Sequence, residues 1–383
     1  FIHYKKTVDI DPGIGTLCPL YYGPTLSFKD FAMQPIGNIY EHFLKADNKK
    51  INIIVATSGD TGSAAIAALK DKFNINVFVL HPDTKISNIQ RKLMTTVDSK
   101  NVFNLAIKGS FDDCQRLVKD MFADKKFSEK INMSAVNSIN WARIMFQIVY
   151  YFFIGLKFLN EGMVFSVPTG NFGNVYAGYI SKKMGLPIKK LIIATNKNDI
   201  LDKAINSREY RPLKTKPSIS PSMDIQTASN FERLLYDLVG EDDEKVRSLM
   251  DKLKNEGGYS LRDDLSIFNY FFSFAVSDKK TKDQMEYSMQ EHRYHIDPHT
   301  ATASAALEDY MDTVVDDHSK EESWDYFILA TADPCKFSET VQEATGVKPK
   351  IPESIKNILN KKENYVKLDN KIDVVKNYIL KKI

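Results

Sequence analysis

Short apolar segments and longer amphipathic segments alternate along most of this sequence, and this alternation limits the possible folds more than any other feature. Apolar runs of strand length lie at 51–56, 76–80, 102–107, 164–167, 191–194 and 326–330. Segments with helical periodicity lie between them, at 61–69, 87–94, 111–122, 141–159 and 174–184. Strands of four to six apolar residues separated by helices of about ten residues or more are typical of parallel βαβ units. The sequence therefore predicts an α/β protein with parallel-rich open sheets flanked by helices.

A chain of 383 residues is long enough for two domains with substantial cores. We expect an N-terminal α/β domain over 1–150 and a C-terminal α/β domain over 151–383, although no Pro/Gly/Ser-rich linker marks the boundary. Within the second domain, 199–300 is more polar and mostly helical by its periodicity, as in an insertion. The lysine-rich sequence beyond 348 is interpreted as a solvated surface helix at the end of a basic tail.

Charge and cysteine usage exclude several functional classes. The 52 basic and 49 acidic side chains are interspersed, so no nucleic-acid footprint is visible. The longest apolar run, 144–159, contains Gln147, Gly155 and Lys157 and is too short for a membrane span. The three cysteines form no CxxC pair, which favours a reducing compartment and a cytoplasmic protein. A targeting leader before Phe1 is left open, because the sequence does not begin with Met.

One lysine stands at a position suited to chemistry. The stretch 21–31 reads YYGPTLSFKDF: an apolar strand over 20–22 turns on Gly23 and Pro24 and presents Lys29 as a helical pattern opens. The positive end of the helix dipole disfavours a second positive charge, so the amine of Lys29 is a candidate nucleophile. A carbonyl compound that captures the amine as an imine would use it. The alternative is an ordinary surface lysine in a first helical turn.

Three turns share one pattern, in which an apolar strand ends, small or hydroxylated residues follow, and a helix begins. They are VATSGDTG at 55–62, VPTGNFGN at 167–174 and LATADPCKF at 329–337. In open α/β sheets, ligands bind at the carboxyl ends of strands, where helix N-termini offer unpaired N–H groups. Three such turns could therefore converge on one anionic ligand.

The two glycine-bearing turns differ in the anion that each would hold. In GNFGN, glycines three residues apart let backbone amides approach a compact monophosphate, but the turn lacks the P-loop and GxGxxG spacings. The TSGDTG turn offers three hydroxyls and several amides, which suits a carboxylate. Each turn has a purely structural alternative as a helix cap. Together with Lys29 they describe pyridoxal 5′-phosphate (PLP) and an amino-acid substrate.

Several long motifs give this sequence a family resemblance. It resembles the threonine synthase family, in the branch shared by enteric bacteria and fungi, among the fold-type II (tryptophan synthase β-like) PLP enzymes. The matching stretches run nearly from end to end: GPTLSFKDF (23–31), ATSGDTGSAA (56–65), KISNIQRKL (85–93), NSINWARI (137–144), SVPTGNFGN (166–174), IIATNKND (192–199), SNFERL (229–234), DPHTATA (297–303) and TADPCKFSETV (331–341).

The resemblance implies a role for each matched residue. Lys29 would carry the cofactor as a Schiff base and move protons, Thr331 would offer a hydroxyl to the pyridine nitrogen, and Asp60 would lie near the 3′ oxygen. The residues implied to hold the cofactor's phosphate are Gly170, Asn171, Phe172, Gly173 and Asn174. Those implied to take the substrate carboxylate are Thr57, Ser58 and Thr61. The implied reaction is a carbon–oxygen lyase reaction that converts O-phospho-L-homoserine and water to L-threonine and phosphate, in amino-acid biosynthesis.

The phosphate of the substrate needs a second anion site. The basic and amide residues within matched motifs are Lys85, Ser138, Asn140, Arg143, Asn230 and Arg233, and the planar fork of arginine suits phosphate. Surface ion pairs or helix caps are the alternative for each of these residues. No metal site is expected, because His292 and His295 lack a third ligand.

One departure from the family pattern leaves the reaction outcome open. Asp333 stands where the family usually has histidine, which exchanges a cation near the cofactor for an anion. Two other functions therefore stay open, a related phospho-lyase that gives 2-oxobutyrate and a non-catalytic binding protein on the same fold. The expected partners are a small-molecule substrate, with neither nucleic acid nor membrane, and the expected assembly is a monomer or a homodimer.

Overall fold

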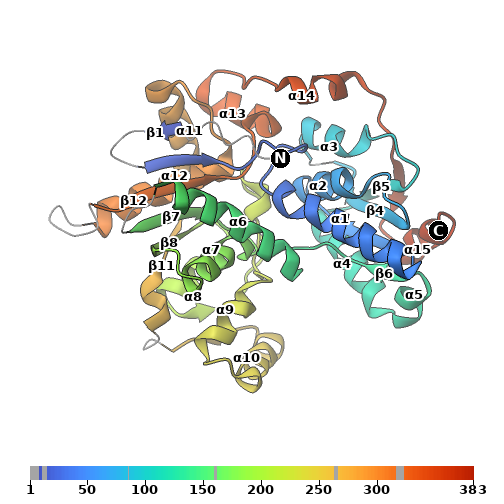
Figure 1. Cartoon of the computed structure of the whole chain (residues 1–383), viewed down its shortest axis with the longest axis horizontal. Coiled ribbons are helices and arrows are strands. Elements are labelled where there is room, and N and C mark those ends of the chain that lie inside the picture. Colours follow the sequence, from blue (N-terminus) through green and yellow to red (C-terminus); the bar gives the residue numbers. More distant parts are fainter. Residues whose placement is uncertain (1–7, 11–14, 85, 159–161, 263–265, 316–322) are drawn as a thin grey trace. The chain divides into compact units, whose positions relative to one another are not determined.

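The protein consists of two compact units that are both discontinuous in sequence (Figure 1). The computed structural model describes residues 8–10, 15–84, 86–158, 162–262, 266–315 and 323–383. Unit 1 comprises Phe1–Tyr21 and Arg143–Pro349, and unit 2 comprises Tyr22–Ala142 and Lys350–Ile383. This partition differs from the expected division into 1–150 and 151–383. The N-terminal strands pair within the sheet of unit 1, and the C-terminal strand pairs within the sheet of unit 2.

Unit 2 is built on an all-parallel five-stranded sheet in the order β13-β5-β4-β3-β6. Its strands are β3 (Ile51–Ala56), β4 (Ile75–Pro82), β5 (Val102–Lys108), β6 (Met133–Ser134) and β13 (Val366–Asp369). Its helices are α1 (Asp30–Asp47), α2 (Asp60–Leu69), α3 (Asn88–Thr95), α4 (Phe111–Ala123), α5 (Lys125–Lys130), α14 (Glu353–Lys356) and α15 (Ile372–Leu380), with the 3-10 turn η5 (Asn357–Asn360).

The central strands of unit 2 are buried on both faces, as the apolar runs predict. Successive side chains of a strand point to opposite faces. Ile54 and Phe78 accordingly belong to a core cluster with Leu117 of α4 and Ile379 of α15. Helix α2 contacts α1, α3 and β4, so helices flank this sheet in the way that parallel sheets require.

Unit 1 is built on a six-stranded sheet in the order β1-β2-β12-β7-β8-β11, parallel except for the β1–β2 pair. Its strands are β1 (Val8–Ile10), β2 (Gly15–Pro19), β12 (Asp325–Ala330), β7 (Met163–Pro168), β8 (Ile188–Thr195) and β11 (Phe271–Ala275). A separate antiparallel pair is formed by β9 (Glu209–Tyr210) and β10 (Tyr259–Ser260).

Some helices of unit 1 pack along this sheet, and others pack on these helices or on the small antiparallel pair (Figure 1). Together they are α6 (Trp141–Phe158), whose first two residues fall in unit 2, α7 (Gly173–Lys183), α8 (Ile200–Asn206), α9 (Phe231–Leu238), α10 (Asp243–Glu256), α11 (Asp278–His292), α12 (Pro298–Thr313) and α13 (Ser338–Thr345), with 3-10 turns η1 (Pro221–Met223), η2 (Ser266–Tyr270) and η4 (Pro334–Phe337). Helix α12 contacts four of the strands, and α7 and α8 contact β8. Small residues such as Ala303 and Ala306 let α12 lie in the core.

The α/β fold class is confirmed, and the predicted parallel strands and intervening helices are found within one to three residues of their expected ends. Two local predictions are wrong. The strand before the Lys29 turn is β2, which ends at Pro19, so 20–22 lies just after it. The polar stretch 199–300 is mostly helical, as predicted, and it also contains β11, which joins the main sheet.

The second wrong prediction is the C-terminal segment, for which the sequence predicts a solvated helix. It instead adds strand β13 to the sheet of unit 2 and then forms α15. Val375 and Ile379, one helical turn apart, are fully buried against β5 and α4. The many lysines around them are the polar face of an amphipathic helix.

The longest helices of the described ranges are too polar or too short to cross a bilayer. The three cysteines, which all lie in the described part of the chain, are buried and form no disulfide.

Candidate active site

Lys29 lies at the start of α1 in unit 2, where the sequence predicts it. Its backbone occupies the N-cap position of the helix. The preceding turn is closed by Thr25, whose backbone N–H and hydroxyl donate to the carboxylate of Asp30 at 2.9 and 2.7 Å. The Lys29 side chain is only 12% exposed, and Nζ lies 3.4 Å from Asp60 Oδ2 and 4.7 Å from the centre of the Phe28 ring. The lysine is thus a largely buried amine and not an ordinary surface side chain.

The turn after β3 brings Asp60 to that amine. Asp60 is the first residue of α2 and is 4% exposed. Thr57 is buried just before it, and its hydroxyl accepts hydrogen bonds from the N–H groups of Gly59 and Gly62, each at 2.9 Å. The structural alternative for this turn was a helix cap by Asp60 or Thr61, and the hydroxyl that accepts these amides is instead that of Thr57. Ser58 and Thr61 are half-buried beside it.

In unit 1, the glycine turn joins β7 to the N-terminus of α7. Phe172 has a left-handed backbone with φ 65°, a conformation that costs a non-glycine residue energy and that persists only where packing holds it. Its ring is buried and packs edge-on against the ring of Phe231, with 5.3 Å between the two ring centres. Gly170 has no room for a side chain, because a Cβ would lie 2.9 Å from the backbone oxygen of Ser222. The turn is therefore a rigid element that ends in the positive pole of a helix.

Asn174 in this turn presents a buried donor. Its Oδ1 accepts hydrogen bonds from the hydroxyls of Tyr150 at 2.6 Å and Tyr151 at 2.9 Å, and this fixes the orientation of the amide. Burial raises the pKa of Tyr151 well above its ordinary value, so the phenol keeps the proton that it donates. Asn174 Nδ2 is buried and has no acceptor among the described residues. A buried donor without a partner is costly, so this position favours an anionic ligand.

The turn after β12 emerges beside the glycine turn, at the same edge of the sheet. Strands β12 and β7 are parallel and paired, so Thr331 and Thr169 follow neighbouring strand ends, and both are buried. Asp333 caps the short turn η4 by accepting the N–H of Cys335 at 2.9 Å. Burial raises the pKa of the Asp333 carboxyl above its ordinary value.

The residues expected at a second anion site fall into separate groups. Asn230 is fully buried against the glycine turn, where its Nδ2 donates to the backbone oxygen of Asn171 at 3.1 Å and its Oδ1 accepts from Arg233 Nε at 3.3 Å. Arg143 is buried in α6, and burial lowers its pKa to about 10, so it keeps its charge at neutral pH.

The remaining three residues lie elsewhere in the chain. In unit 2, Asn140 accepts the N–H of Ala142 at 3.0 Å and donates to Tyr40 Oη at 3.3 Å, and Ser138 is half-buried nearby in sequence. Lys85 lies outside the described residues.

One residue of this region was missed by the sequence reasoning. Gln90 of α3 is 2% exposed and donates from Nε2 to Asp60 Oδ1 at 2.8 Å. It lies within the motif KISNIQRKL, so the motif match was a signal, but the apolar periodicity of a helix does not reveal a buried glutamine.

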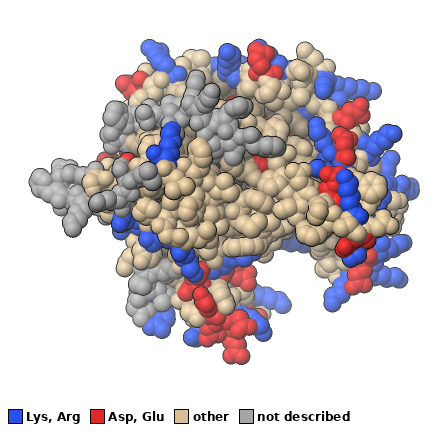
Figure 2. All heavy atoms as spheres, viewed as in Figure 1, with Lys and Arg blue, Asp and Glu red and all other residues tan. Residues whose placement is uncertain are grey.

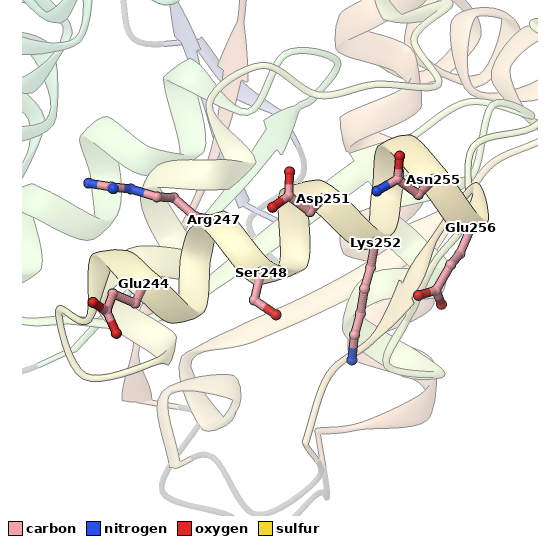
Figure 3. Close-up of a pocket in the computed structure, with 7 residues that line it drawn as sticks. All are labelled: Glu244, Arg247, Ser248, Asp251, Lys252, Asn255 and Glu256. Atoms are coloured by element: carbon pink, nitrogen blue, oxygen red, sulfur yellow. The ribbon is translucent and has the colours of Figure 1, made fainter.

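A polar hollow on α10 of unit 1 contains none of the predicted site residues (Figure 3). Its seven lining side chains all come from one exposed helix and include both signs of charge. Arg247 pairs with Asp243 at 2.5 Å on the same helix, and Figure 2 shows acidic and basic side chains together in this region. Such a surface has neither burial nor a single sign of charge with which to select a ligand.

Comparison with known families identifies two matched regions. Residues 20–261 match the family model described as "Pyridoxal-phosphate dependent enzyme". Residues 300–379 match the model described as "Threonine synthase, C-terminal". The first match includes Lys29 and the glycine turn at 170–174. The second includes most of the C-terminal segment.

Relatives and solved structures agree with these matches. The chain is 41% identical to threonine synthase of Pseudomonas aeruginosa, covering 94% of this chain and 76% of the relative. It is 42% identical to that of Saccharomyces cerevisiae, with the same coverage. The PLP-bound threonine synthase of Brucella melitensis superposes with a TM-score of 0.92 at 39% identity, over 98% of this chain and 80% of that one. The Escherichia coli enzyme gives 0.80 at 30% identity, with the same coverage. This chain belongs to the threonine synthase family of pyridoxal-phosphate dependent enzymes.

Proposed function

We propose that this chain is a PLP-dependent threonine synthase that converts O-phospho-L-homoserine and water to L-threonine and phosphate. The observation that carries the proposal is the placement of Lys29, a largely buried amine at the mouth of a helix and 3.4 Å from the carboxylate of Asp60. Membership of the threonine synthase family supports the same reaction.

The residues present fit the cofactor. Lys29 would hold its aldehyde carbon, and the turn 170–174 would hold its phosphate. Asn174 Nδ2 is a buried donor that lacks an acceptor among the described residues, and a phosphate oxygen would satisfy it. Glycine at 170 lets the turn pack against the backbone of Ser222, and the N-terminus of α7 favours an anion. Thr331 would offer a neutral hydroxyl to the pyridine nitrogen.

Each group in the chain would then have a defined task. Bound PLP withdraws electrons from Cα of an amino-acid substrate, which makes the Cα proton acidic. Lys29 Nζ would take up and return protons at Cα and Cβ. Asp60 would hold that amine in place. Ser58 and Thr61, with backbone amides of the α2 N-terminus, would bind the substrate carboxylate, while Thr57 keeps the turn closed.

The substrate's own phosphate would be bound by charged and amide groups. Arg143 and Lys85 are the leading candidates, because a guanidinium or an ammonium forms strong charge-assisted hydrogen bonds with phosphate. Asn230 and Arg233 lie beside the glycine turn, so their first task would be to support the cofactor's phosphate. Ser138 and Asn140 complete the proposed set.

A cytoplasmic location and a monomeric or homodimeric assembly are part of the proposal. Three cysteines without a disulfide support a reducing compartment. Sedimentation analysis of the purified chain would give the assembly state.

An end-product assay tests the proposal. Incubation with PLP and O-phospho-L-homoserine should release threonine and phosphate in equal amounts, and Lys29→Ala should lose both products together with the visible absorbance of the bound cofactor. Lys45→Ala, on an exposed lysine of the same helix, is the control and should behave as wild type. Release of 2-oxobutyrate in place of threonine, or an unchanged spectrum in Lys29→Ala, would refute the proposal.

A further inference from the structure

We infer that Gln90 is a positioning residue for Lys29, acting through Asp60. The inference rests on the proposed function, in which Lys29 carries PLP. Gln90 Nε2 donates to Asp60 Oδ1 at 2.8 Å, and Asp60 Oδ2 accepts from Lys29 Nζ at 3.4 Å. The two oxygens of one carboxylate are thus assigned to two different donors, so Gln90 fixes the rotation of the carboxylate that faces the amine.

The orientation of the Gln90 amide is determined by its neighbours. Ser87 caps α3 by accepting the backbone N–H of Gln90 at 3.2 Å, and the same hydroxyl donates to Gln90 Oε1 at 3.1 Å. The amide oxygen is therefore occupied by a donor, and the NH₂ group is left to face Asp60. A rotated amide would place its oxygen against the carboxylate, which is repulsive.

Close packing holds the amide in this place. Gly59 has φ +143°, and a Cβ added there would lie 2.7 Å from both Cδ and Nε2 of Gln90. The residue before Asp60 therefore has to be glycine for Gln90 to approach. Gln90 and Asp60 are both more than nine-tenths buried, so water cannot readily replace either partner.

The other side of α3 is tied to the C-terminal segment of the same unit. Glu363 accepts from Arg91 Nε at 2.8 Å, from Arg91 Nη2 at 3.2 Å and from the Thr95 hydroxyl at 2.7 Å. The backbone N–H of Asn364 donates to the carbonyl of Thr95 at 2.6 Å. Helix α3 thus carries Gln90 on one side and a bidentate anchor on the other, which gives the amide a rigid support.

Removal of the amide should change the chemistry of Lys29. Without the Gln90 donor, the carboxylate of Asp60 holds the ammonium of Lys29 more strongly, so the amine gives up its proton at higher pH. Gln90→Met keeps the side-chain length and removes the donor. Gln90→Glu adds a second carboxylate beside Asp60 and should act in the same direction more strongly.

Gln284 offers a matched control in unit 1. It is a buried glutamine of α11 whose Nε2 donates to Glu308 Oε2 at 2.9 Å and whose Oε1 accepts from Ser304 Oγ at 3.1 Å. Gln284→Met therefore removes the same pattern of hydrogen bonds at a place without a proposed catalytic lysine. Thermal unfolding should show a similar loss of stability in Gln284→Met and Gln90→Met.

The test measures the amine of Lys29 in the full chain before PLP is added. Trinitrobenzenesulfonate labels only unprotonated amines, and mass spectrometry of the Lys29 peptide gives the pH midpoint of labelling. We expect that midpoint to rise by about one pH unit in Gln90→Met, to rise further in Gln90→Glu, and to stay unchanged in Gln284→Met. We also expect the dissociation constant for PLP in equilibrium dialysis to rise about tenfold in Gln90→Met alone.

The outcomes separate the inference from the proposed function. Equal midpoints and PLP affinities in Gln90→Met and Gln284→Met would overturn the inference, whether or not Lys29 binds PLP. Retention of PLP by Lys29→Ala would instead overturn the proposed function. If Gln90→Met does not fold, Ser87→Ala replaces it, because it frees the amide to rotate, and it should raise the midpoint in the same direction.

Discussion

At the scale of single residues, the site depends on side chains whose orientations are fixed by neighbours. The amide of Asn174 is held by two tyrosine hydroxyls, and the carboxylate of Asp60 lies between a glutamine and a lysine. Preorganised groups of this kind bind a ligand without a further ordering cost.

Asn174→Asp should weaken the retention of PLP. The substitution keeps the shape of the side chain and replaces the buried NH₂ donor by a carboxylate oxygen, which repels a phosphate. A hydrogen bond to a charged group contributes about 1.5 to 3 kcal/mol, so the dissociation constant should rise at least about tenfold. Equilibrium dialysis measures this change.

Tyr151→Phe should also raise the dissociation constant for PLP, but by less than Asn174→Asp. It removes one of the two hydroxyls that orient the Asn174 amide. PLP affinity equal to wild type in both variants would remove Asn174 from the phosphate site.

Site residues that lie in a turn between a strand and a helix could be predicted from the sequence. A site residue that is defined by its contact with a distant part of the chain could not. Lys29 could be placed because a Gly–Pro turn precedes it and a helical pattern follows it. Gln90 could not, because its partner Asp60 is 30 residues away and no local pattern reveals the contact.

At the scale of elements, buried parallel strands were predictable and edge strands were not. The apolar run at 51–56 coincides with β3 because both of its faces are buried. Strand β13 reads VKLD and is largely exposed, so it lacks the apolar signal that a central strand carries. Strand β11 was missed because its five residues lie in a polar region.

A surface ion pair ties α1 to the loop after α2 and should respond to acid. The Lys72 ammonium, 2.8 Å from Glu41, lowers the pKa of Glu41 to about 2. Because the folded pKa lies below the unfolded value of about 4.3, the stabilisation is present above that value and is lost as pH falls towards 2.

Glu41→Gln should therefore lower the free energy of unfolding by about 0.2 to 1 kcal/mol at pH 7 and by progressively less as the pH falls towards 2. Urea unfolding at several pH values measures the difference. Glu129→Gln, on an exposed glutamate of α5, is the control. A deficit in Glu41→Gln that stayed constant down to pH 2 would contradict this assignment.

At the scale of the whole molecule, each end of the chain belongs to a different unit from the long segment next to it in sequence. The first strands join the sheet of unit 1, and the last strand and helix complete unit 2. Sequence reasoning assumed two continuous domains because no local pattern shows which distant strand a terminal segment will pair with. The C-terminal segment thus supports the unit that contains Lys29.

Ile379→Ala should destabilise unit 2 by about 2 to 5 kcal/mol, because the side chain is fully buried against α4 and leaves a cavity. Ile383→Ala is the matched control, since Ile383 is 42% exposed. Chemical denaturation followed by circular dichroism would detect the difference. Equal stability of the two variants would show that α15 is not part of the core of unit 2.

The central claim is that PLP is bound through Lys29, and one measurement tests it most directly. Borohydride reduction of the PLP-loaded chain makes the attachment permanent, and peptide mass spectrometry then locates it. We predict a phosphopyridoxyl group on Lys29, in the peptide that contains SFKDF. A label on any other lysine, or no label on a chain that retains PLP, would contradict the account.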